Sequence, residues 1–171
     1  MLGYLAVWAA VVGLLVAMCV VDARTRRIPN KLVIGVCGSW AVLQVIAYGY
    51  GALAGAPLME AARACDVPHA LLPLFALPDA TVGIITAAAA VLCLAGIGAL
   101  YERLFRKQAM GAGDVKLIGA FALFLGPVPT IACVMLACIF ALIAALPARA
   151  HTFPFAPALT LAFICVMLVG L

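Results

Sequence analysis

Uncharged apolar runs long enough to cross a lipid bilayer recur along this chain. Leu2 to Val21 and Leu32 to Tyr50 contain no charged residue, and each matches the roughly 20 residues that a membrane-spanning α-helix needs. Hydrophobic residues make up 69% of the sequence and charged residues 9%, against roughly a quarter charged in soluble domains. A water-soluble fold of this length would expose large apolar patches. The sequence therefore predicts an all-α, polytopic integral membrane protein with a single transmembrane domain over residues 1–171.

Proline, glycine and charged residues divide the apolar sequence into about six expected helices. The first run has no basic start and no small-residue cleavage site, so we interpret it as a retained helix rather than a signal peptide. Pro29 disfavours helix just before it, and Asn30 can then cap the second helix. Residues 51–79 are expected to form an external loop with a short interfacial helix around Leu58 to Cys65. The four later helices are expected at 80–100, at about 115–125, at 130–146 and from about 155 to 171.

The distribution of basic residues tests this arrangement. Nine of the ten lysines and arginines fall in the loops at 22–31, 101–116 and 147–154, which alternation of the helices places on one side of the membrane. Arg63, in the 51–79 loop, is the exception. Because cytoplasmic loops carry an excess of lysine and arginine, we expect that side to be cytoplasmic and both termini to be external. Membrane orientation explains the net charge of +4, which therefore does not indicate nucleic-acid binding.

The seven cysteines do not form a recognisable metal or redox motif. Six lie inside apolar runs, only Cys65 lies in a loop, and no C-x-x-C pair exists. Zinc knuckles and thiol redox sites use such pairs. We expect the cysteines to act as small packing residues.

Two of the six acidic residues lie where an apolar helix meets the predicted cytoplasmic surface. Asp22 closes the first apolar run and Asp114 precedes the fourth. Each has a structural interpretation, because Asp22 can be a membrane-flanking residue neutralised by nearby arginines and Asp114 can be a helix N-cap. A helix cap does not require the two glycines that precede Asp114, Gly111 and Gly113. Glycine lets another backbone, such as an extended substrate segment, approach closely.

Taken as a pair, the two aspartates predict acid–base chemistry. Two carboxylates close together in a low-dielectric site share one proton, so one can act as a base on water while the other protonates a carbonyl oxygen. That is amide hydrolysis without a metal, a cofactor or a covalent intermediate. An alternative is a Mg²⁺ site on the two carboxylates, although no phosphate-cradling loop accompanies them.

Other hydrolase chemistries lack their residues. The single serine, Ser39, lies in the middle of the second apolar run and outside a G-x-S-x-G context. The two histidines, His69 and His151, are predicted on opposite sides of the membrane, and no H-E-x-x-H motif is present. The aspartyl interpretation is therefore favoured by elimination as well as by fit.

Three segments of the sequence resemble one known family, the prepilin leader peptidases within the GxGD intramembrane aspartyl proteases. They are Asp22-Ala-Arg-Thr-Arg-Arg-Ile-Pro-Asn30, Gly111-Ala-Gly-Asp-Val-Lys-Leu117 and Pro154-Phe-Ala-Pro-Ala158. G-x-G-D alone is a weak signal, whereas G-x-G-D-x-K-L together with an upstream D-x-R-x-x-x-I-P-N is a strong one. The likeness runs in order and spacing along nearly the whole chain.

The resemblance implies an activity and a site. Family members remove the leader peptide from type IV prepilins and pseudopilins at the cytoplasmic face of the bacterial inner membrane. Their catalytic aspartates correspond to Asp22 and Asp114, with supporting positions at Gly111, Gly113, Lys116, Pro29 and Asn30. The resemblance assigns no role to Lys116 or to the turn from Pro154 to Pro157. The expected partners are a prepilin or pseudopilin substrate and membrane lipid.

One departure from the family narrows the expected function. Large members carry an N-terminal cytoplasmic region with a four-cysteine zinc motif and also methylate the new N-terminus. Nothing in this sequence corresponds to that region. We therefore expect a peptidase without N-methyltransferase activity, similar to the small branch that serves tight-adherence (Flp-type) pili.

Two other functional classes remain open at the level of sequence. A small proton- or cation-coupled transporter subunit would also carry intramembrane acids, but its site should lie near the bilayer midplane rather than at one surface. A structural membrane subunit would leave both motifs unexplained. The sequence leaves open the particular prepilin, the oligomeric state and the route of substrate entry.

Overall fold

Helices account for almost all of the chain that the computed structural model describes, which is residues 2–25, 28–64, 67, 69–106, 111–148 and 155–169. No strand occurs among these residues, so the all-α prediction is confirmed. The elements are α1 (Leu2–Thr25), α2 (Asn30–Ala54), α3 (Leu58–Ala64), the 3₁₀-helix η1 (His69–Phe75), α4 (Ala80–Phe105), α5 (Ala112–Leu125), α6 (Pro127–Ala148) and α7 (Phe155–Val169).

Four of these helices are long and apolar enough to cross a membrane. They are α1, α2, α4 and α6, as Gly3–Thr25, Asn30–Ala54, Ala80–Phe105 and Pro127–Leu146. Helices α5 and α7 have 14 and 15 residues, fewer than the roughly 20 that a straight span needs. Together, α1, α2, α4, α5, α6 and α7 place a helix at each of the six expected positions. The protein is thus a polytopic membrane protein.

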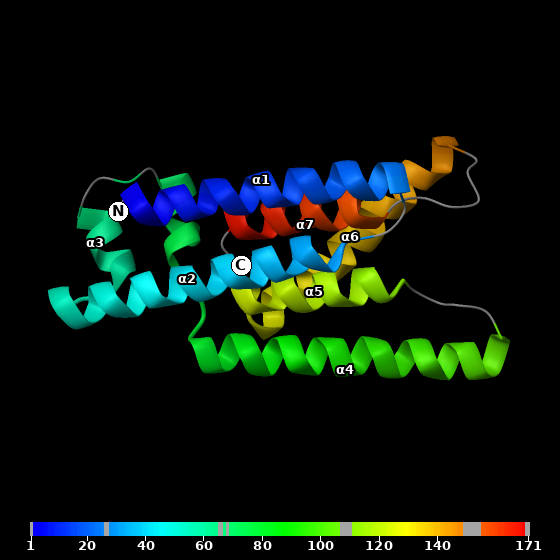
Figure 1. The fold of residues 1–171 in the computed structure, drawn as a ribbon. Helices are drawn as coiled ribbons and strands as arrows, with labels where there is room; N and C mark the ends of the chain where they lie inside the picture. The colour runs from blue at the N-terminus through cyan, green and yellow to red at the C-terminus, as the bar shows by residue number, and fades with distance from the viewer. Residues whose placement is uncertain are drawn as a thin grey trace.

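The core lies where α5 and α7 meet α1. Figure 1 shows α7 running beside α1, with α2 and α5 next to them and α4 on the outside. Phe121 of α5 stacks on Phe163 of α7, with ring centroids 4.3 Å apart, and Phe124 meets the same ring edge-on. Trp8 of α1 packs on Phe124 at 5.6 Å. Helix α5 is buried on nearly all sides from Leu117 to Leu125, so it forms the centre of the bundle despite its short length.

Helix α4 packs on α5 through two glycines. A Cβ on Gly83 would lie 2.7 Å from the carbonyl oxygen of Leu123, and one on Gly119 would lie 2.5 Å from Cγ2 of Val91. Small residues let membrane helices approach closely. Most of α4 otherwise faces outward, because little of its most apolar stretch is buried.

We expect Gly83→Ala to destabilise the protein, because the added methyl group meets backbone that cannot rotate away. Overpacking of this kind costs about 1–3 kcal/mol. The thermal midpoint in detergent, followed by loss of the monodisperse peak, should therefore fall by roughly 3–10 °C. Gly96→Ala on the same helix is the control, since nothing lies within 4 Å of a Cβ there. Equal midpoints for the two variants would contradict this account of the α4–α5 contact.

Helix boundaries differ from the expected ones at the end where the motifs lie. Helix α1 continues past Val21 to Thr25, so Asp22 lies inside its last turn rather than after it. Helix α5 begins at Ala112, three residues before the expected start, so Asp114 is its third residue. Short polar segments next to an apolar helix can extend it, because the helical hydrogen bonds satisfy their backbone groups.

The capping prediction for Asn30 is wrong, and the structural alternative considered for Asp114 does not apply. Pro29, not Asn30, is the N-cap residue of α2, with an extended backbone (φ −68°, ψ 130°) and no side-chain cap bond. Gly111, not Asp114, is the N-cap residue of α5. A proline or glycine can hold the extended cap conformation without a side-chain acceptor, and this leaves both polar side chains free for contacts between helices.

The remaining boundaries also differ by a few residues. Helix α2 reaches Ala54 and ends at Gly55, whose φ of 68° suits glycine, and α4 reaches Phe105. Helix α6 begins at Pro127, because proline is tolerated in a first helical turn. In the loop after α2 the expected short helix is present as α3, although Cys65 lies outside the described residues.

Candidate active site

Several helix ends meet at one end of the bundle. Helices α1, α4 and α6 end there, and α2, α5 and α7 begin there (Figure 1). The terminal turns on this side carry the described basic residues Arg24, Lys31, Arg103, Arg106 and Lys116. We call this the basic end of the bundle. Four other basic residues of the expected loops, Arg26, Arg27, Lys107 and Arg149, lie outside the described residues.

Asp22 is a buried carboxylate at the basic end. Only 6% of the residue is exposed, which is unusual for aspartate unless it is paired or hydrogen-bonded. Its Oδ2 accepts a hydrogen bond from the backbone N–H of Ala156 in α7, at 3.3 Å. The structure thus places Asp22 at the junction of α1 and α7.

Asp114 lies in the first turn of α5, before the apolar stretch that begins at Val115, and is partly buried. Burial, and to a lesser extent repulsion from the charge of Asp22, raise the pKa of its carboxyl to about 6, while a hydrogen bond from the Gly111 backbone acts in the opposite direction. The two aspartates are therefore close enough to influence each other electrostatically. Residues 92 positions apart in the sequence are thus brought near each other, whereas the sequence predicted only that they share one face of the membrane.

The two glycines of the G-x-G-D motif make room for different neighbours. A Cβ on Gly111 would lie 3.1 Å from Oδ2 of Asp114. A Cβ on Gly113 would lie 3.1 Å from Cβ of Ile28, in the link between α1 and α2. Gly111 therefore leaves space for the carboxylate, and Gly113 lets the start of α5 pack against the segment that follows Asp22.

A second contact joins the same two segments. Lys116 donates a hydrogen bond from Nζ to Oδ1 of Asn30, at 3.1 Å. Pro29 ends the link from α1 and its carbonyl accepts the N–H of Leu32, which fixes the start of α2. The hydrogen bond between Lys116 and Asn30 thus connects the first turns of α2 and α5.

Two contributors to this arrangement were not predicted from the sequence. Ile28 lies inside the first motif but is an ordinary apolar residue there, and its partner Gly113 is far along the chain. Ala156 acts through its backbone, which no sequence pattern of side chains reveals. The only signal was the Pro154–Pro157 turn, and Pro154 lies outside the described residues.

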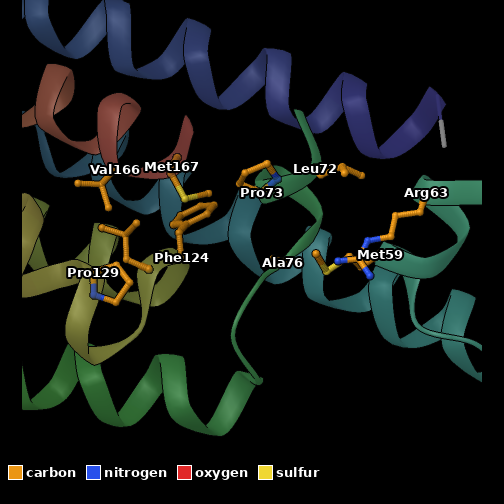
Figure 2. Close-up of a pocket in the computed structure, with 10 residues that line it drawn as sticks. Met59, Arg63, Leu72, Pro73, Ala76, Phe124, Pro129, Val166 and Met167 are labelled. Atoms are coloured by element: carbon orange, nitrogen blue, oxygen red, sulfur yellow. The ribbon is translucent and has the colours of Figure 1, made fainter. Parts of the chain in front are cut away.

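The chemistry available here is that of two neighbouring carboxylates. No cluster of three or more histidine, cysteine or acidic side chains that could hold a metal ion occurs within the described ranges. A separate cavity of about 290 Å³ lies at the opposite end, where α5 and α7 finish (Figure 2). Its lining is apolar apart from Arg63 of α3, so it offers no acid–base pair.

Comparison with known proteins decides between the functional classes. Residues 9–146 match the type IV leader peptidase family. The chain belongs to this family. Type IV leader peptidases are aspartic-type enzymes that process prepilins, so this protein is a prepilin leader peptidase rather than a transporter subunit. The matched segment contains both aspartates and ends before α7. Neither the curated proteins nor the solved structures contain a significant match to the chain.

Proposed function

We propose that Asp22 and Asp114 are the catalytic pair of this leader peptidase. The observation that carries the proposal is the burial of Asp22 next to Asp114, whose pKa is raised to about 6 by burial and by the charge of Asp22. Perturbed carboxyl groups of this kind are typical of acid–base sites. Membership of an aspartic peptidase family is consistent with two aspartates acting together.

The reaction follows from one shared proton. The ionised carboxylate takes a proton from a water molecule as the water oxygen bonds to the scissile carbonyl carbon, and the protonated carboxyl gives its proton to the carbonyl oxygen. The tetrahedral intermediate then collapses: the C–N bond breaks, the leaving nitrogen takes the proton held by the first carboxylate, and a hydroxyl of the intermediate returns a proton to the second carboxylate as the new carbonyl forms. The pair returns to its starting protonation state, as general acid–base catalysis requires.

Gly111, Gly113, Lys116, Pro29 and Asn30 support the pair in this proposal. Their contacts fix the first turns of α2 and α5 relative to the link after α1. A group held within a fraction of an ångström reacts far faster than a mobile one. We also propose that the backbone of the substrate lies close to Gly111 and Gly113.

We further propose that the substrate is a Flp-type prepilin or a related pseudopilin, and that the protein does not methylate the new N-terminus. The absence of any C-x-x-C pair from the 171 residues supports this. Co-expression with a Flp-type prepilin, in a host without other leader peptidases, should convert the precursor to a smaller product. Intact-mass measurement should show a free, unmodified N-terminal amine. An unprocessed precursor would contradict the substrate, and a product heavier by one methyl group would contradict the missing methyltransferase activity.

We place the basic end of the bundle on the cytoplasmic face of the bacterial inner membrane, because basic residues favour that side. Single cysteines at Thr25 and Arg106, in a background without the native cysteines, should be shielded from an impermeant maleimide in intact cells. A cysteine at Glu60 in α3 should be labelled. Labelling of Arg106→Cys with protection of Glu60→Cys would reverse the proposed orientation and move the aspartates to the external face.

A further inference from the structure

The first turn of α7 carries few free hydrogen-bond donors. The first N–H groups of an α-helix have no partner within the helix, and proline has no N–H at all. Helix α7 begins Phe155-Ala156-Pro157, and Pro154 precedes it in the sequence. Of these four residues, only Phe155 and Ala156 therefore have an N–H to offer at the basic end.

One of these donors meets Asp22. The N–H of Ala156 donates to Oδ2 of Asp22 at 3.3 Å, across 134 positions of sequence. Ala156 is fully buried and Asp22 almost so, so this contact is sheltered from water. A helix N-terminus also favours a nearby negative charge, because the helix dipole is positive there.

A second contact fixes the register of α7 against α1. Sγ of Cys19, about one turn before Asp22, donates to Oγ1 of Thr160, about one turn after Ala156, at 3.4 Å. Leu159 and Phe163 anchor the same helix in the core. Two hydrogen bonds about one turn apart restrict sliding of α7 along α1. The Ala156 N–H therefore stays directed at the carboxylate of Asp22.

We propose that the backbone N–H of Ala156 is a positioning group for catalysis, which extends the site to α7; this inference rests on the proposed role of Asp22. An N–H can only donate, so Oδ2 is held as an acceptor and Oδ1 is left as the oxygen that takes the proton from water. Pro157 removes the next donor, so that the N–H of Phe155 is the only other one that the residues from Pro154 to Pro157 can offer. The bond does not touch substrate and should act on the chemical step rather than on binding.

The sharpest test deletes this N–H without changing a side chain. Incorporation of lactic acid in place of Ala156, by suppression of a stop codon, replaces the N–H with an ester oxygen. Incorporation of leucic acid in place of Leu159 removes one ordinary N–H from the same helix and serves as the control. Both proteins are purified in detergent, and prepilin cleavage is measured over a range of substrate concentrations. We expect kcat of the first to fall about ten- to a hundredfold, the scale of a misplaced catalytic group, with KM within about twofold. The control should keep kcat within about twofold.

Each outcome decides the matter. Unchanged kcat with the Ala156 ester, or an equal loss with both esters, overturns the positioning role. If the Ala156 ester does not fold, Ala156→Pro removes the same N–H at a position in the first turn where proline is tolerated, and it must show the same loss of kcat. If neither the Ala156 ester nor Ala156→Pro folds while the Leu159 ester does, the hydrogen bond from Ala156 to Asp22 is required for folding. That result also overturns the positioning role in catalysis. Failure of the unmodified protein to cleave, or activity in Asp22→Asn, contradicts the proposed function instead.

Discussion

Asp22→Asn and Asp114→Asn are each expected to abolish leader cleavage while the protein still inserts in the membrane. Asparagine keeps the size of aspartate and much of its hydrogen bonding, including an acceptor for the Ala156 N–H, but it cannot exchange a proton with water or with a leaving amine. If the two carboxylates act as one unit, the double variant should be no worse than either single variant, because such losses are not additive. The measurement is the cleavage rate divided by the amount of inserted protein.

Asp79→Asn provides the matched control for this experiment. Asp79 is exposed at the start of α4, at the end of the bundle away from Asp22 and Asp114, and its side chain makes no cap bond. Its replacement should leave the rate nearly unchanged. If the two aspartates served only as structural residues, their variants would lower abundance and keep the rate per molecule. Near-normal specific activity in either Asp22→Asn or Asp114→Asn would contradict the proposal that the two aspartates are the catalytic pair.

Gly113→Leu is expected to lower the cleavage rate by roughly a hundredfold, the effect of displacing a catalytic group by about 1 Å. Even a Cβ at this position would lie 3.1 Å from Cβ of Ile28, so a leucine must push the start of α5 away from the link between α1 and α2. Asp114 is the next residue and moves with it. The rate is again measured per molecule of inserted protein.

Two further variants separate this steric effect from a general disturbance. Ala112→Leu adds the same bulk to the same turn, at an exposed position, and should cost little. Ile28→Gly removes the Cβ and the rest of the side chain that Gly113→Leu meets, so the double variant should recover much of the lost rate. A double variant as poor as Gly113→Leu alone would show that contact with Ile28 is not the cause.

The sequence allowed the membrane class and the placement of the two aspartates at helix ends on one side to be predicted, for physical reasons. An uncharged run such as Leu2 to Val21 has no stable alternative to a helix in lipid. Charged residues occur almost only where helices end, so Asp22 and Asp114 could be placed at helix boundaries and on a common side.

The exact helix ends and the contacts between helices could not be predicted in the same way. Asn30 was expected to cap α2, yet its side chain accepts a hydrogen bond from Lys116, 86 positions away. Sequence rules for capping consider only the backbone groups near the capping residue. Here Asn30 has a hydrogen-bond partner, Lys116, from another helix. The same holds for Gly113 and Ile28, whose close contact depends on how α5 packs against the link after α1.

The hydrogen bond between Asp22 and Ala156 also bears on how the protein is made. Asp22 lies in α1, Asp114 in α5 and Ala156 in α7, so the three residues are synthesised in this order. Chains are synthesised from the N-terminus at about 5–20 residues per second, so a nascent chain carries Asp22 for several seconds before α7 exists to hold it. In this arrangement a truncated or unfinished chain contains both acids but lacks the helix that orients one of them. Synthesis of α7 thus becomes a condition for full assembly of the proposed site in the membrane.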